Sequence, residues 1–477
     1  MLTSARHILK RYYFMDNIHD IKLFLEPQSI AIIGISRKTG EKHDNALQNL
    51  LAYGYRGRIY PVNPNADEIL GIKAYPSIKS IENPVDHAVI VTPRTQVPGH
   101  IRDCAEKGVK AITIVTQGFS DAGDDEGQYL HKEIVRLAST TGVRILGPNS
   151  FGSANVYTNF CPAFAKLQMQ RNPVALVCQS GMLFNGVSEY RFVGKGIDVA
   201  NITNVDFADC LEYFEQDPQV KVIVLHIEGM PDARRFLKIA RRVSMKKPVI
   251  ALKTGRSEQG IAAAQSHTGS LAGKNEVWDS AFKQAGVISV DNLEELVDVT
   301  RTLSMLPVMD NPNVAVATFS GGTGIMALDG MRNSKLRSGD LPPKTRDLLK
   351  KHTPAWLSVG NPLDYWPMIM GADNQPGMII EILEPLLQDN SFGGIIFIQI
   401  VPDEYRGEYA KQILTGMVEK YPHRPLTAIF TGPLNSEYVK KLQEEGKVLA
   451  FPTPERASRA LARLWQYSEY RRQNAVY

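Results

Sequence analysis

Short apolar runs and amphipathic helical stretches alternate along the chain from Ser29 onward. Each unit consists of a β-branched run, a glycine-containing or polar turn and a stretch with helical periodicity. This order is typical of parallel sheets with crossover helices. Because the runs are apolar on both faces, we expect strands buried between helix layers. The pattern predicts an α/β protein of three consecutive doubly wound modules, over residues 20–152, 165–305 and 311–468.

The expected strands share this apolar character and end in polar or glycine-containing loops. In the first module they lie within residues 29–36, 57–63, 87–93, 111–119 and 143–149. In the second they lie within 174–181, 196–206, 221–229, 248–255 and 287–290, and in the third within 314–324, 394–401, 425–432 and 448–454. Helices are expected over 293–306, at the end of the second module, and over 455–470. Open α/β sheets bind ligands at the carboxyl ends of their strands, so the loops there are the candidate sites.

Composition narrows the class of protein. The chain has 477 residues, 43% hydrophobic and 22% charged, with a net charge of +4 and no long basic run. Neither nucleic acid nor a membrane is indicated as a partner, and no apolar run approaches the ~20 residues of a membrane-spanning helix. The four cysteines lack CxxC spacing, which favours reduced thiols in the cytoplasm and no metal site. The basic N-terminus lacks the pattern of a secretory signal.

The first strand is followed by a glycine loop, residues 34–40, with the sequence GISRKTG. It lacks the GxGxxG spacing of a nicotinamide site, and no acidic residue ends the second strand to bind a ribose. Arg37 and Lys38 suit a ligand that carries several phosphates, such as coenzyme A (CoA). The alternative is that Gly34 only permits the turn and both cations are solvated surface residues.

A second candidate is His267, which stands among small and hydroxyl-bearing residues in the segment AAAQSHTGSLAG. A neutral imidazole nitrogen can attack an activated phosphoryl group, and Thr268 and Ser270 can donate to its oxygens. A solvent-exposed loop histidine is the alternative. Glu228 follows an apolar strand of the same module and could orient the imidazole.

A third candidate is the turn Gln179-Ser180-Gly181, where a strand leads into a helix. A helix N-terminus offers free amides to a dianion, although Ser180 is also a common helix-capping residue type. The third module has a comparable turn, SGGTG at residues 320–324, without a titratable group, and a structural role is favoured there.

These motifs together resemble the NDP-forming acyl-CoA synthetase superfamily, which includes succinyl-CoA synthetase and the ADP-forming acetate–CoA ligases. The resemblance extends over nearly the whole chain from about residue 25. It is most specific at SHTGSLAG, residues 266–273, and continues through SIAIIGIS, GYRGRIYPVNPN, EILGIKAYPS, ILGPNSFG, CQSG, VDFADCLEYF, IEGM and SVGNPLD.

The resemblance implies a Rossmann-like CoA-binding domain followed by two flavodoxin-like ligase domains. It implies His267 as the phosphohistidine, Glu228 as its stabilising residue, and phosphate contacts from Gln179, Ser180, Gly181, Thr268, Gly269 and Ser270. The implied CoA-binding residues are Gly34, Ser36, Arg37, Lys38, Asn63, Thr92, Pro93, Gln117, Gly118, Asn149 and Ser150. The implied reaction forms acyl-CoA, ADP and phosphate from an acid, CoA and ATP, reversibly, through an acyl phosphate and phosphohistidine.

In this family the nucleotide binds an ATP-grasp module, for which the sequence has no counterpart. We therefore expect a separate ATP-grasp β subunit that carries ATP or ADP with Mg²⁺, in a hetero-oligomer such as α2β2. Departures from the family pattern at residues 200–204, and at Tyr365 and Trp366, favour an acid bulkier or more polar than acetate. The competing hypothesis is a CoA-binding regulatory protein of the same fold without turnover.

Overall fold

The computed structural model describes residues 20–40, 45–164, 166–167, 170–185, 193–261 and 275–475. The chain divides into two compact units, residues 1–291 and 292–477, which are described separately. No helix within these described ranges is long and apolar enough to cross a membrane.

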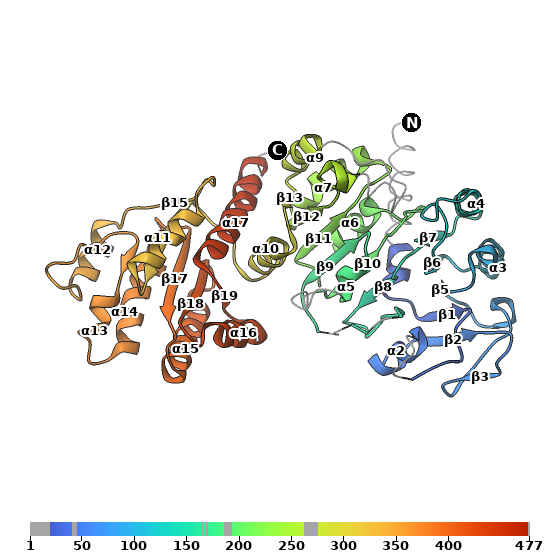
Figure 1. Cartoon of the computed structure of the whole chain (residues 1–477), viewed down its shortest axis with the longest axis horizontal. Coiled ribbons are helices and arrows are strands. Elements are labelled where there is room, and N and C mark those ends of the chain that lie inside the picture. Colours follow the sequence, from blue (N-terminus) through green and yellow to red (C-terminus); the bar gives the residue numbers. More distant parts are fainter. Residues whose placement is uncertain are drawn as a thin grey trace, which may run out of the picture. The chain divides into compact units, whose positions relative to one another are not determined.

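The first sheet is parallel, in the order β2-β1-β5-β6-β7 (Figure 1). Its strands are β1 (Ser29–Ile33), β2 (Arg58–Val62), β5 (His87–Ile90), β6 (Ala111–Ile114) and β7 (Arg144–Leu146). Helix α2 (Ala46–Tyr53) packs on one face, and α3 (Val97–Lys107) and α4 (Asp125–Thr141) pack on the other. The short strands β3 (Glu68–Ile69) and β4 (Ile72–Lys73) form a separate antiparallel hairpin.

The second sheet has the order β13-β12-β11-β9-β10-β8, in which β8 alone runs antiparallel to its neighbour. Its strands are β8 (Ser153–Asn155), β9 (Val174–Cys178), β10 (Lys195–Asp198), β11 (Val222–Ile227), β12 (Val249–Lys253) and β13 (Ile288–Val290). Its helices within the described residues include α5 (Met182–Asn185), α6 (Phe207–Gln216), α7 (Ala233–Ser244) and α9 (Asn275–Ala285). Apolar residues of α6, α7 and α9 join one buried cluster with the strands.

The second unit holds a third parallel sheet, in the order β15-β14-β17-β18-β19, with β16 paired to β14. Its strands are β14 (Asn313–Thr318), β15 (Arg337–Ser338), β16 (Leu363–Asp364), β17 (Gly394–Ile400), β18 (Leu426–Thr431) and β19 (Leu449–Phe451). Its helices are α10 (Leu293–Met305), α11 (Gly321–Gly330), α12 (Pro343–Lys350), α13 (Trp366–Met370), α14 (Gln375–Gln388), α15 (Glu404–Lys420), α16 (Asn435–Glu445) and α17 (Pro454–Asn474).

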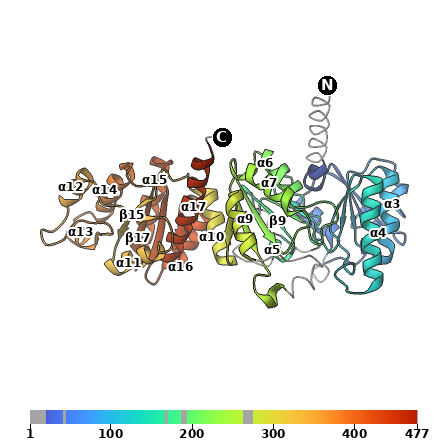
Figure 2. The ribbon, with the colours of Figure 1, turned by 90° about the horizontal axis from the view of Figure 1, so that it is seen from above.

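Helix α10, which we expected at the end of the second module, packs beside α17 (Figures 1 and 2). Arg456 of α17 donates to both carboxylate oxygens of Asp298, over 2.7 and 2.8 Å. Arg463 of α17 likewise donates to Glu295 over 2.8 Å. The helical periodicity was read correctly, but these two charge-assisted contacts join residues more than 150 positions apart, and periodicity contains no such information.

The predicted fold class is confirmed, because all three main sheets are parallel apart from β8 and alternate with helices. Each predicted strand segment overlaps an observed strand, which ends where a polar loop begins. Strands β10 and β14 start one residue before the predicted segments. The prediction missed β3, β4, β8, β15 and β16, which have only two or three residues each. Runs that short lack a readable apolar period.

Candidate functional site

All the predicted CoA residues lie in loops at the carboxyl ends of the first sheet. Gly34 to Lys38 follow β1, and Asn63 follows β2. Thr92 and Pro93 follow β5, Gln117 and Gly118 follow β6, and Asn149 and Ser150 follow β7. Because the five strands are parallel, these loops share one edge of the sheet, where open α/β sheets bind ligands.

The close approach of β1 and β5 leaves no room for a side chain at residue 34. Gly34 has φ +86°, and a Cβ atom there would lie 2.5 Å from Cγ2 of Thr92. Thr92 is buried, and its hydroxyl has no hydrogen-bond partner among the described residues. A bare glycine backbone beside a buried hydroxyl without a partner fits a ligand that approaches the main chain closely and hydrogen-bonds there.

The loop after β1 is held by amide side chains, so its charged side chains stay exposed. Asn63 donates to the carbonyl of Ile35 over 2.8 Å. Asn45 caps α2 and donates to the carbonyls of Ser36 and Lys38, over 3.1 and 3.2 Å. The side chains of Ser36, Arg37 and Lys38 are exposed at this edge, where they can reach phosphate oxygens.

The loop after β7 connects this edge to the second sheet. Asn149 has φ +61°, and its N–H donates to the carbonyl of Thr116 over 3.0 Å. Ser150 is buried, and its hydroxyl donates to the carbonyl of Asp198 over 2.5 Å. Gln117 and Pro93 are exposed, while Gly118 donates to Asp121 over 3.0 Å.

The carboxyl ends of β9 and β11 bring Gln179 and Glu228 together. The Gln179 side-chain oxygen accepts from the N–H groups of Glu228 and Gly229, over 2.7 and 3.0 Å. Its side-chain nitrogen donates to the carbonyl of Ala200 over 3.3 Å. Lys253, at the end of β12, donates to the carbonyl of Glu228 over 2.9 Å. Both backbone polar groups of Glu228 are therefore held in place by buried side chains.

Asp198, at the end of β10, connects the carboxyl edges of the first and second sheets. Its carboxylate accepts from the N–H of Phe151 over 2.7 Å and from that of Ala200 over 3.2 Å. Cys178 Sγ lies 3.9 Å from the same carboxylate. Burial raises the pKa of Asp198 to about 7, assisted by the charge of Glu228 and opposed by the two N–H groups. A carboxyl group that titrates near neutral pH is typical of functional sites.

At Gly181 two loops of the main chain approach each other closely. A Cβ atom there would lie 2.5 Å from the Cβ of Phe151, so the turn before α5 packs directly against the loop after β7. Ser180 and Gly181 immediately precede α5, as expected of a strand-to-helix turn. The phosphate-binding and CoA-binding loops of the prediction are therefore neighbours.

His267, Thr268, Gly269 and Ser270 lie outside the described residues, so their position relative to Glu228 is not part of the structure. Within the described ranges, no group of three histidine, cysteine or acidic residues could hold a metal ion.

The sequence reasoning missed Asp198, Lys253 and Phe151. Asp198 and Lys253 are single charged residues at the ends of otherwise apolar strands, a signal that could have drawn attention to them. Phe151 gave no such signal, because its contact with Gly181 depends on the packing of two distant loops.

Fold and site together define a CoA-binding α/β ligase. Residues 28–155 match the family pattern of a CoA binding domain, and residues 171–303 match that of a succinyl-CoA ligase like flavodoxin domain. These ranges contain the two sheets whose carboxyl edges meet at Asp198.

The similar proteins narrow the class. The α subunit of the ADP-forming acetate–CoA ligase II of Pyrococcus furiosus is 36% identical, covering 94% of this chain and 97% of that subunit. The ADP-forming acetate–CoA ligase of Methanocaldococcus jannaschii is also 36% identical, but this chain spans 64% of its length. A solved structure from Ca. Korarchaeum cryptofilum, of an acetyl-coenzyme A synthetase in complex with phosphate and ADP, is 32% identical with a TM-score of 0.86, covering 94% of this chain and 97% of that one. The chain belongs to the ADP-forming acetate–CoA ligase family.

Proposed function

We propose that this chain is the CoA-binding, phosphoryl-carrying subunit of an ADP-forming acyl-CoA ligase. The enzyme would convert a carboxylic acid, CoA and ATP into acyl-CoA, ADP and phosphate, reversibly. The observation that carries the proposal is the junction at Asp198, which hydrogen-bonds the loop of Asn149 and Ser150 beside the loops of Gln179 and Glu228. A thioester and a phosphoryl acceptor need such adjacent sites if an acyl phosphate is to pass between them.

In the direction of acyl-CoA cleavage, a phosphate oxygen attacks the acyl carbonyl and the CoA thiolate leaves. The acyl phosphate then transfers its phosphoryl group to the imidazole of His267 and releases the carboxylate. Glu228 would orient that imidazole and stabilise its positive charge, a role that carboxylates have beside catalytic histidines. Gln179, Ser180, Gly181, Thr268, Gly269 and Ser270 would surround the phosphoryl group.

The phosphohistidine would then give its phosphoryl group to ADP. We place ATP or ADP, with Mg²⁺, on a separate ATP-grasp subunit. Two comparisons support this assignment: the Pyrococcus relative is named a subunit alpha, and the Methanocaldococcus ligase is longer than the region that this chain matches. The acid is proposed only as a small carboxylic acid.

The decisive experiment incubates the chain and its partner subunit with γ-labelled ATP and measures acid-labile, base-stable label on this chain. Wild type should be labelled, and His267→Ala should not. Equal label on both proteins excludes His267 as the carrier. Subsequent addition of CoA with a panel of carboxylic acids should discharge the label, whereas a regulatory CoA-binding protein would keep it or never acquire it.

A further inference from the structure

A cavity of about 340 Å³ lies at the opposite, amino-terminal edge of the first two sheets. Its lining includes Glu26, just before β1, Arg56, just before β2, and Arg171, just before β9. The CoA and phosphate loops lie at the other ends of the same strands. The cavity is therefore separate from the site described above.

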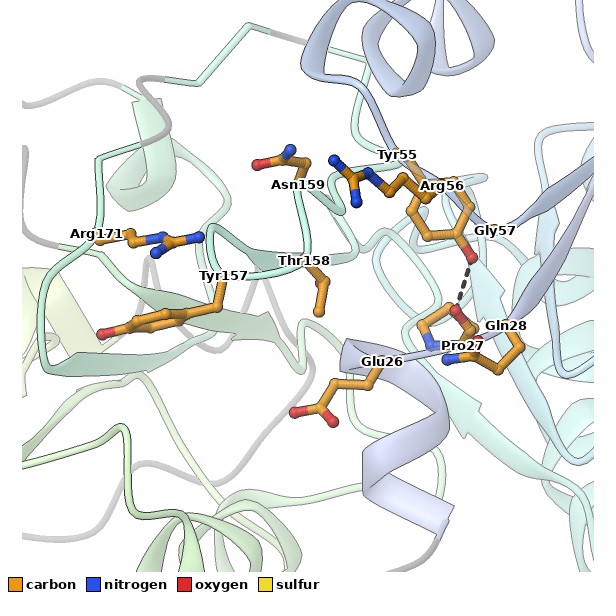
Figure 3. A pocket seen from close by; sticks show the side chains of 10 residues that line it. All are labelled: Glu26, Pro27, Gln28, Tyr55, Arg56, Gly57, Tyr157, Thr158, Asn159 and Arg171. Atoms are coloured by element: carbon orange, nitrogen blue, oxygen red, sulfur yellow. Dashed lines mark hydrogen bonds between the residues drawn. The ribbon is translucent and has the colours of Figure 1, made fainter.

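Two arginines give one side of this cavity a positive character. Figure 3 shows Arg56 beside Asn159, with Arg171 over the ring of Tyr157. The Arg171 guanidinium carbon lies 5.9 Å from the centre of that ring. Among the residues that the structure describes, neither arginine forms an ion pair, so both guanidinium groups can receive an anion. Two guanidinium groups and an amide donor that line one cavity suit the several oxygens of a phosphate group.

Glu26 gives the cavity one carboxylate, whose charge is already compensated. Its Oε1 atom accepts from Lys195 over 3.0 Å and from Tyr213 over 3.1 Å. The Glu26 side chain is still 26% exposed, and its Oε2 atom lies 3.8 Å from Lys22. In the view of Figure 3 this carboxylate lies across from the two arginines. A carboxylate in such a place accepts hydrogen bonds from sugar hydroxyl groups, as acidic residues do in ribose recognition.

We propose that this cavity binds a small phosphorylated sugar, either a free sugar phosphate or the ribose phosphate of a nucleoside monophosphate. The phosphate would bind Arg56 and Arg171 with the amide of Asn159, and the sugar hydroxyl groups would bind Glu26 and Thr158. The volume lies near the lower end of the ~300–1,000 Å³ typical of ligand sites, which suits a ligand of this size. Bound at the amino-terminal edge, it would not compete with CoA.

Isothermal titration of the intact chain with ribose 5-phosphate tests the proposal, with AMP, ribose and inorganic phosphate as further probes. Ribose 5-phosphate should bind. Arg56→Gln and Arg171→Gln should each weaken its binding at least about tenfold, the usual effect of losing a hydrogen bond to a charged group. Arg58→Gln is the matched control, because Arg58 begins β2 without lining the cavity and its loss removes the same charge. That variant, and saturation with CoA, should change the affinity less than about twofold.

The proposal is overturned by no binding to the wild-type chain, by unchanged affinity in both cavity variants, by displacement by CoA, or by binding of ribose that equals that of ribose 5-phosphate. Inorganic phosphate that binds as tightly as ribose 5-phosphate would also overturn it, because Glu26 would then contribute nothing. Binding of AMP at least as tight as that of ribose 5-phosphate identifies a nucleotide as the preferred source of the sugar phosphate, and weaker binding identifies a free sugar phosphate. None of these outcomes depends on ligase turnover, so they are distinct from a failure of the proposed function.

Discussion

The two ends of strand β10 hold buried charges in opposite ways. At the amino end, Lys195 is 1% exposed and pairs with Asp217 over 2.6 Å and with Glu26 over 3.0 Å. At the carboxyl end, Asp198 is equally buried. The described residues supply it with two backbone N–H groups and a thiol but no cation. One charge is fully paired, whereas the other is only solvated by dipoles.

The difference indicates which end of the strand serves the stability of the fold and which end serves the reaction. A paired buried charge keeps its protonation state and fixes packing, and it is costly to break. A buried carboxyl without a cation instead gains a proton near neutral pH, as the raised pKa of Asp198 indicates. We therefore expect substitutions at the amino end to change stability alone, and substitutions at the carboxyl end to change turnover or the pH dependence of stability as well.

The largest stability effect is expected for Lys195→Met. It leaves the buried carboxylate of Asp217 without its cation, and breaking a buried pair from one side typically costs about 3–5 kcal/mol. Urea unfolding followed by circular dichroism measures the loss. Lys22→Met is the control, because the Lys22 side chain is 54% exposed and its Nζ atom lies 3.8 Å from Oε2 of Glu26, a long contact. Such exposed pairs contribute about 1 kcal/mol or less. Equal losses in both variants would contradict the structural role of the Lys195 pair.

Glu228→Gln should produce the largest catalytic effect. If Glu228 stabilises the imidazolium form of the phosphorylated histidine, its loss should lower turnover by about 10²–10⁴-fold, the range for groups that act beside a catalytic base. Stability should change little, because glutamine has the same size and keeps the backbone contacts to Gln179 and Lys253. Asp217→Asn at the amino end should lower stability and leave turnover little changed. Wild-type turnover in Glu228→Gln, measured with the partner subunit, would remove Glu228 from the mechanism.

The raised pKa of Asp198 predicts that the stability of the fold depends on pH. Its pKa is about 7 in the folded chain, against the ordinary value of 3.8 that we assign to it in the unfolded chain, so the folded state holds an additional proton between these values. Its contribution to stability is therefore greatest below about pH 4 and is lost as pH rises towards 7. Between pH 5 and 8, wild type should lose about 2–3 kcal/mol that Asp198→Asn does not lose. Parallel stability profiles for the two proteins, measured by urea unfolding across this range, would show that Asp198 does not titrate there.

Much of this comparison could be predicted from the sequence, but only where the information is local. The apolar runs located β9, β10 and β11, and parallel strands necessarily place the loops of Gln179 and Glu228 at one edge. Glycine in the turn after β1 likewise indicated a special backbone, which the φ of +86° at Gly34 bears out.

The pairing of Lys195 with Glu26 joins residues 169 positions apart, and no period or motif contains it. The cavity between Arg56 and Arg171 arises for the same reason, from segments that the fold brings together. The packing of α10 on α17 was missed because amphipathicity shows that a helix has a buried face and not which surface covers it.

Two buried side-chain amides provide the most specific test, with the smallest expected effect. Gln179, at the carboxyl end, accepts from two backbone N–H groups, and Asn155, opposite Lys195 at the amino end, accepts from Tyr157 over 3.0 Å. Gln179→Met leaves the N–H groups of Glu228 and Gly229 unsatisfied, which costs roughly 1–3 kcal/mol and displaces Glu228. Turnover should fall about tenfold with the KM for CoA unchanged, because Gln179 lies outside the CoA loops.

Asn155→Leu should lower stability by a similar free energy and leave the turnover of the folded protein unchanged. The measurement is kcat and KM at matched folded fractions, with the partner subunit present. If both variants lose turnover equally, the two ends of β10 are not functionally distinct. If only Gln179→Met does, the buried polar groups at the carboxyl end serve the reaction, and those at the amino end serve the fold.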